Sequence, residues 1–226
     1  MRCQGWWLSK LQCVIRIGFT DSPLKDLEIK GDDEMGQLNA SKALEKLKEG
    51  NRNFCKNKLG HEKQDAARRA ELTGGQEPFA VVLSCADSRV VPELVFDVGL
   101  GEIFVVRVAG NIANTSSIAS IEYAIQHLNP KVNLVVVLGH EGCGAVKAAL
   151  GGGDCGHHLN MLLANLQPAV SQATGKTDDA RFVNTVKKNA RLTANRLRSA
   201  SKTFERKSLE IVPAYYNLAS GKVDFL

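Results

Sequence analysis

Residues 79–89 read FAVVLSCADSR, and residues 134–144 read LVVVLGHEGCG. Each segment begins with a short apolar run rich in valine, 79–83 and 134–138, and passes directly into a polar stretch that contains cysteine. Such runs are typical of strands buried on both faces of a parallel sheet. Functional side chains of parallel sheets gather where strands end and loops begin. The two segments therefore predict two buried strands whose following loops carry the chemistry of the protein.

The order of the remaining elements predicts the fold class. A third valine-rich run, 103–108, lies between the two quoted segments, and 209–216 is a last candidate strand. Apolar residues recur at helical spacing over 118–128, and Asn129 and Pro130 end this predicted helix. Strands that alternate with helices predict an α/β fold with a mostly parallel central β-sheet flanked by helices.

Helices are also expected at both ends of the sheet region. Asn39 is the predicted N-cap of an amphipathic helical arm that starts at Ala40. Its apolar residues recur at steps of three, four and seven: Ala43, Leu44, Leu47 and Phe54. The stretches 159–166 and 182–197 are predicted to be helical as well.

The first part of the chain differs from the rest. Residues 28–34 form an acidic run without amphipathic period, and 1–37 are predicted to be an N-terminal extension outside a single domain at 38–226. The stretch 1–19 is interrupted by Lys10 and Arg16 and is followed by no clear cleavage site, which argues against a signal peptide.

Composition excludes several functional classes. The chain of 226 residues has a formal charge of +5, but its charges are interspersed, so no nucleic-acid partner is expected. No apolar run approaches the roughly 18 residues of a membrane span. Six irregularly spaced cysteines do not suit a disulfide scaffold. They favour a reducing, cytoplasmic location and metal or catalytic roles.

The two strand-end loops supply the ligands of a candidate metal site. Cys85 follows the first strand, and His140 and Cys143 follow the other. If the two strands are neighbours, all three side chains converge. Thiolate and imidazole ligands suit zinc, and a catalytic zinc keeps three protein ligands so that water or substrate occupies the fourth position.

Asp87 and Arg89 stand beside the first ligand and alternate around Ser88, which lets them face the same way and pair. A carboxylate held by arginine stays ionised at neutral pH and can accept a hydrogen bond from a metal-bound hydroxide. The alternative role is a salt bridge that only clamps the loop, and the two roles are compatible.

These segments resemble the β-class carbonic anhydrases, whose pattern is C-x-D-x-R followed some fifty to sixty residues later by H-x-x-C. The similarity extends over nearly all of 43–226 through ALEKLKEGNR, PELVFDVGLGEIFVVRVAGN, SIEYA and YYNLASGKVDFL. The resemblance implies a lyase with one zinc ion per chain that hydrates carbon dioxide to bicarbonate. It also implies homodimers or larger assemblies of dimers.

The resemblance assigns roles to individual residues. Cys85, His140 and Cys143 match the zinc ligands, and Asp87 and Arg89 match the pair beside them. The positions that match substrate contacts or the apolar pocket are Gln76, Phe104, Ala109, Tyr123 and the Gly144 amide. Val82 stands where the bicarbonate-inhibited subgroup tends to carry tryptophan, which favours the plant-like subgroup with an open fourth site. In the other subgroup Asp87 itself would bind zinc at rest.

Several alternatives stay open. The same zinc chemistry can act on another small linear electrophile such as carbon disulfide, or the protein can be a non-catalytic zinc-binding module. A thiol redox protein is disfavoured because no C-x-x-C occurs. Cys155 with His157 and His158 is either a second metal site or part of an exposed glycine-rich loop. Nucleotide binding is excluded because Gly142-x-Gly144 has neither phosphate-loop nor dinucleotide-loop spacing.

Overall fold

A five-stranded sheet organises the part of the chain that the structure describes. The structure is a computed structural model, and it describes residues 38–128 and 132–226. The strands are β1 (Ala80–Ser84), β2 (Ile103–Arg107), β3 (Leu134–His140), β4 (Glu210–Tyr216) and β5 (Val223–Phe225). Their order is β2-β1-β3-β4-β5, and every neighbouring pair is parallel except β4 with β5. The predicted α/β fold with a mostly parallel sheet is confirmed.

Helices surround this sheet, and α1 begins at the residue that the sequence predicts. The α-helices of the described residues are α1 (Ala40–Cys55), α2 (Ala66–Glu71), α3 (Pro92–Val95), α4 (Thr115–Tyr123), α5 (Gly144–Gly151), α6 (His157–Ala164), α7 (Gln167–Ser171) and α8 (Asp178–Arg198). Asn39 caps α1 as predicted, because its Oδ1 accepts the Lys42 N–H at 2.9 Å. The predicted helix 159–166 corresponds to α6, which ends at Ala164, and α4 continues as a π-helical turn over Ala124–Leu128.

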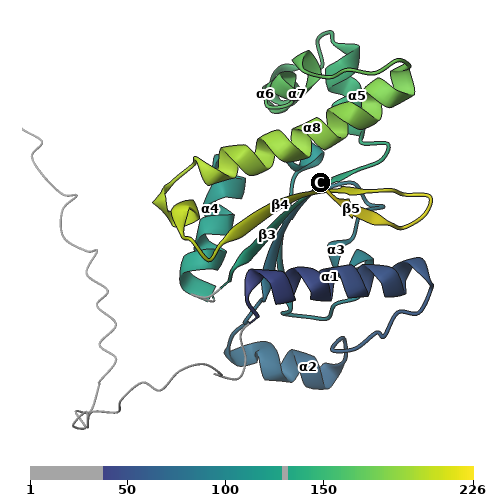
Figure 1. The fold of residues 1–226 in the computed structure, drawn as a ribbon. Helices are drawn as coiled ribbons and strands as arrows, with labels where there is room; N and C mark the ends of the chain where they lie inside the picture. Colours follow the sequence, from purple (N-terminus) through teal and green to yellow (C-terminus); the bar gives the residue numbers. More distant parts are fainter. Residues whose placement is uncertain (1–37, 129–131) are drawn as a thin grey trace, which may run out of the picture. The chain divides into compact units, whose positions relative to one another are not determined.

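The two central strands are covered on both faces. Every residue of β1 and β3 is buried. Because successive side chains of a strand point to opposite faces, Val82 and Val136 pack in one apolar cluster with Leu47 of α1, whereas Val81 and Val135 pack with α4 and α8. Figure 1 shows α1 on one side of the sheet and α4 and α8 on the other. Burial on both faces is the reason that these runs contain no alternating polar residues.

Two strands differ from the predictions. The run 103–108 was expected to be buried on both faces, but β2 lies at the edge of the sheet and its residues from Phe104 to Val106 are only half-buried. The expectation is wrong because an edge strand has one unpaired side and less cover. The short antiparallel strand β5 at the opposite edge was not predicted, since three residues carry too little pattern.

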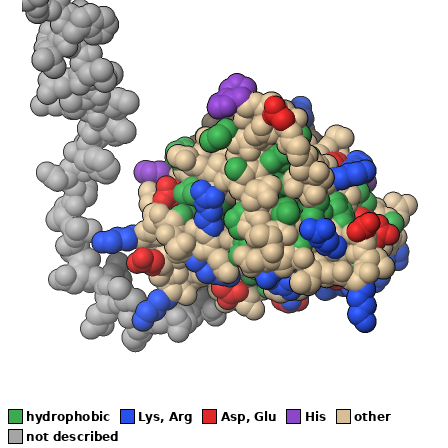
Figure 2. All heavy atoms as spheres, turned by 90° about the horizontal axis from the view of Figure 1, so that it is seen from above, with side chains coloured by type: hydrophobic (Ala, Val, Ile, Leu, Met, Phe, Trp, Pro, Cys, Tyr) green, Lys and Arg blue, Asp and Glu red, His purple; other side chains and the backbone are tan. Residues whose placement is uncertain are grey.

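Some expectations lie outside the described residues. These are the N-terminal extension over 1–37 and the helix end at Asn129 and Pro130. Among the described helices, none has both the length and the apolarity that a membrane crossing requires. On the face drawn in Figure 2, basic and acidic side chains are scattered among apolar and uncharged ones rather than gathered by sign.

Candidate metal centre

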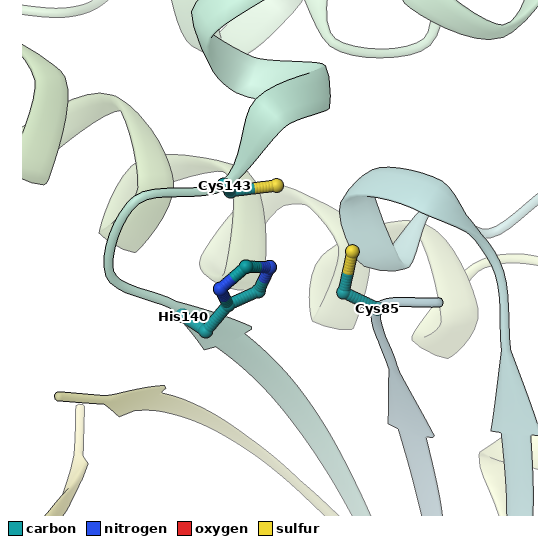
Figure 3. A group of neighbouring side chains, drawn as sticks. All are labelled: Cys85, His140 and Cys143. Carbon is teal, nitrogen blue, oxygen red and sulfur yellow. The ribbon is translucent and has the colours of Figure 1, made fainter. Parts of the chain in front are cut away.

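Three buried side chains converge at the carboxyl edge of the sheet. Cys85 directly follows β1, His140 is the last residue of β3, and Cys143 is the N-cap of α5. Because β1 and β3 are parallel neighbours, both loops open at the same edge. The sulfur atoms and an imidazole nitrogen lie within 4.8 Å of one another. Figure 3 shows the three side chains directed toward a common space. We call these residues the Cys–His–Cys cluster.

The imidazole of His140 has the tautomer that a metal ligand needs. Its Nδ1 lies 2.8 Å from the carbonyl oxygen of Glu141. A carbonyl oxygen only accepts, so Nδ1 carries the proton and Nε2 keeps its lone pair. Nε2 is buried, and within the described residues it has no hydrogen-bond partner. A buried nitrogen acceptor beside two sulfurs is the donor set that zinc prefers, so the residues present fit this metal.

The pKa values of the two cysteine side chains are shifted in opposite directions. The hydrogen bond with Cys143 lowers the pKa of Cys85, and contacts with His140 and the backbone N–H groups of Asp87 and Gly110 lower it further. The Gly110 N–H lies 3.4 Å from the Cys85 sulfur. The same thiol–thiol contact raises the pKa of Cys143, and burial adds to the effect. A metal ion would bind both groups as thiolates, so its binding releases protons.

Asp87 and Arg89 form the expected ion pair at the edge of the cluster. Arg89 donates from Nε to Asp87 Oδ1 at 2.9 Å and from Nη2 to Oδ2 at 2.7 Å, and its backbone N–H also reaches Oδ1 at 3.0 Å. These bonds, the side-chain ones first, hold the pKa of Asp87 well below its ordinary value. Asp87 Oδ2 lies 3.9 Å from His140 Nε2. An ionised carboxylate therefore stands next to the position of the metal.

Hydrogen bonds from more distant residues fix the two loops. Arg107 at the end of β2 donates to the carbonyl oxygens of Cys85 and Asp87. The buried amide of Asn189 on α8 donates to the Gly110 carbonyl oxygen at 2.8 Å. The Glu141 carboxylate accepts the Leu218 N–H at 2.9 Å. These residues could not be predicted from the sequence, because their partners are main-chain atoms, which leave no pattern in it.

Two of the predicted substrate residues lie beside the cluster. Ala109 is half-buried and immediately precedes Gly110, whose N–H contacts the Cys85 sulfur. Gly144 follows Cys143 and opens α5, so its backbone N–H belongs to the first turn of that helix. A Cβ atom added at Gly144 would meet no atom within 4 Å, so space is open there.

The other three predicted substrate residues are not brought to the cluster within one chain. Gln76 is exposed and precedes β1, at the opposite end of that strand from Cys85. Phe104 pairs with Val81, four residues before Cys85, which is roughly 13 Å along a strand. Tyr123 is 51% exposed and contacts the ring of His127.

The second cysteine and histidine group does not form a comparable site. Cys155, His157 and His158 are exposed, and His157 already belongs to α6. In the described ranges, the Cys–His–Cys cluster is the one group of three or more potential ligands close enough to hold a metal ion. The four described cysteines, Cys55, Cys85, Cys143 and Cys155, are free thiols.

Fold and cluster together define a parallel α/β protein with a candidate zinc centre at the strand ends. A family model described as carbonic anhydrase matches residues 80–223. Carbonic anhydrase 2 of Mycobacterium tuberculosis is 38% identical over 197 residues, which cover 83% of this chain and 93% of that protein.

Solved structures agree with these matches. The β-carbonic anhydrase of Coccomyxa, solved with acetazolamide, has a TM-score of 0.65 and 26% identity, with 79% of this chain and 83% of that chain covered. A tetrameric β-carbonic anhydrase of Sordaria macrospora has a TM-score of 0.64 and 25% identity, with 70% and 85% covered. The chain belongs to the β-carbonic anhydrase family.

Proposed function

We propose that this chain hydrates carbon dioxide reversibly to bicarbonate and a proton, with one zinc ion held by Cys85, His140 and Cys143. The observation that carries the proposal is the buried Cys–His–Cys cluster with an ionised carboxylate beside it. A purely structural zinc site closes its coordination shell with four protein ligands, whereas a catalytic one leaves a position open. Three ligands and a neighbouring carboxylate favour the catalytic kind.

The roles of the residues follow from their chemistry. When bound, zinc would supply a Lewis acid that lowers the pKa of a water molecule and so provides a nucleophile near neutral pH. Asp87 is held as a carboxylate by Arg89 and can only accept hydrogen bonds. It would therefore orient the O–H of the nucleophile and direct its lone pair at the substrate carbon. We assign Arg89 to keeping Asp87 ionised and in place.

The fourth position is proposed to be open in the resting enzyme, as in the plant-like subgroup. Asp87 uses both carboxylate oxygens for Arg89. Binding to the metal would require it to give up at least part of this two-pronged contact. The Asp87–Arg89 pair therefore supports the open form over the form in which Asp87 is itself a ligand.

The proposed substrate contacts fall into two groups, those within one chain and those that need a second copy of the chain. Ala109 and the Gly144 amide lie beside the cluster in the same chain, where they would contact carbon dioxide and the developing negative oxygen. Gln76, Phe104 and Tyr123 would reach a substrate only if a second copy of the chain presented them. A homodimer or an assembly of dimers is consistent with the half-buried edge strand β2 and with the tetrameric relative.

The decisive experiment measures zinc content and carbon dioxide hydration on the same samples. His140→Ala and Cys143→Ser should lose zinc and hydratase activity together, whereas Cys155→Ser should keep both because Cys155 is exposed and lies outside the cluster. Full hydratase activity in a metal-free variant would refute the proposal. Zinc without hydration would indicate a non-catalytic module, and turnover of carbon disulfide alone would indicate a different substrate.

The proposed location is the cytoplasm. The two cluster thiols suit its reducing environment.

A further inference from the structure

Arg107 contacts the turn that carries the first metal ligand. It is the last residue of β2 and pairs with Ser84, the last residue of β1. Its Nε donates to the carbonyl oxygen of Cys85 at 3.0 Å, and its Nη2 donates to the carbonyl oxygen of Asp87 at 2.6 Å. One planar guanidinium thus spans two acceptors of the same turn, and its rigid fork restrains the distance between them.

The opposite side of this turn faces the cluster. The Cys85 sulfur lies in the cluster and accepts a hydrogen bond from the Gly110 N–H at 3.4 Å. The Asp87 carbonyl oxygen accepts a second hydrogen bond, from the Val90 N–H at 3.0 Å. The carbonyl groups of Cys85 and Asp87 are therefore held by Arg107, while the Cys85 sulfur is held by the Gly110 N–H. Any rotation of these peptide groups would move Cys85 and Asp87 together.

Arg107 uses its charge in an unusual way for an exposed arginine. In the ranges 38–128 and 132–226, no carboxylate lies within ion-pair distance of its guanidinium. Its hydrogen bonds go to main-chain oxygens at the metal centre instead. Solubility alone does not require an arginine side chain to be fixed by two hydrogen bonds to main-chain oxygens.

We propose that Arg107 is a positioning residue for the carbonic anhydrase reaction. It holds the Cys85–Asp87 turn in the conformation that places the Cys85 sulfur within the cluster and the Asp87 carboxylate beside His140. It contacts neither the metal position nor the reacting atoms. This inference rests on the proposed function, because orientation of the nucleophile by Asp87 is what makes the position of the turn important.

The test compares Arg107→Met with Arg107→Lys and with a matched control, Arg191→Met, which removes an exposed arginine of α8. We expect Arg107→Met to retain one zinc ion per chain and its melting temperature, while kcat falls about 100-fold and KM changes little, because a misplacement of about 1 Å can cost that much. Arg107→Lys can reach only one carbonyl oxygen and should recover part of kcat. Arg191→Met should match the unchanged protein.

A spectroscopic measurement separates this inference from the proposed function. With Co²⁺ in place of zinc, Arg107→Met should change the thiolate-to-metal absorption band, because the Cys85 sulfur moves relative to the ion. Loss of kcat with an altered band supports the inference. A kcat within threefold of the unchanged protein, or an unaltered band, overturns it.

If the unchanged protein binds metal but hydrates no carbon dioxide, the proposed function fails while the band still tests the position of the turn. If Arg107→Met does not fold, Arg107→Lys is decisive, and a kcat and band equal to those of the unchanged protein overturn the inference.

Discussion

Replacing Glu102 by glutamine is expected to lower the free energy of unfolding near neutral pH. Glu102 lies between Lys46 of α1 and Lys63 of the loop that follows it, at 2.9 and 2.8 Å, and its other oxygen accepts the Gly99 N–H at 2.8 Å. The carboxylate joins α1, this loop and the segment that leads into β2. Its side chain is only 10% exposed, so loss of its charge weakens its bonds to the buried Gly99 N–H and to the two lysine ammonium groups.

The size of the effect follows from the pKa of Glu102. Burial raises this pKa, but the Gly99 N–H, Lys63 and Lys46 outweigh burial and lower it from 4.5 to about 2. That lowering corresponds to about 3 kcal/mol of stability. The two lysine side chains are 41% and 47% exposed, so solvent screening reduces the net value. A loss of roughly 1–2 kcal/mol, or roughly 2–8 °C in melting temperature, is expected for Glu102→Gln.

The stabilising contribution of Glu102 should decrease as the pH falls. The pKa is lower in the folded than in the unfolded protein, so the contribution is present above about pH 5 and is lost as the pH falls toward about 2. Thermal unfolding should be measured from pH 7 to pH 3 for the unchanged protein and for Glu102→Gln. The difference between their free energies of unfolding should shrink to roughly two fifths of its neutral value at about pH 3. Glu45→Gln is the control, since Glu45 pairs with Lys48 on the surface and its loss should leave the melting temperature unchanged. Equal melting temperatures at pH 7, or a difference in the free energy of unfolding that stays constant with pH, would refute the reasoning.

Three further predictions concern the site and its supports. Asp87→Asn keeps the shape of the side chain but removes the charge that Arg89 holds, so hydration should fall about 100-fold or more while zinc content stays constant; stopped-flow assays with metal analysis check this, and undiminished turnover would contradict it. Glu141→Ala removes the acceptor of the Leu218 N–H and should lower zinc affinity about 10-fold in chelator competition; an unchanged affinity would mean that the loop needs no such anchor. Asn51→Ala removes a buried amide that bonds Val95, Gly221 and Val223 and should lower stability by about 2–3 kcal/mol in urea unfolding; a loss below about 0.5 kcal/mol would show that water replaces those bonds.

Local pattern was sufficient for much of the fold and for the candidate ligands. The runs 79–83 and 134–138 contain only apolar residues because both faces of β1 and β3 are buried, so composition alone predicts central strands. Asn39 caps α1 through an oxygen that lies only three residues from its donor, Lys42. Cys85, His140 and Cys143 follow these strands directly. Once the strands are parallel neighbours, the shared edge brings the three side chains together.

The sequence by itself thus determined the two central strands, the mostly parallel α/β class and the three candidate ligands, because each rests on a local pattern. That β1 and β3 are neighbours, so that Cys85 meets His140 and Cys143, was left to the tertiary structure. Only the tertiary structure decided that β2 lies at an edge and that Gln76, Phe104 and Tyr123 lie away from the cluster in one chain. It alone revealed the anchors Arg107, Asn189 and Glu141. The physical reason is that these residues bond main-chain atoms of distant segments, and every residue has such atoms whatever its side chain.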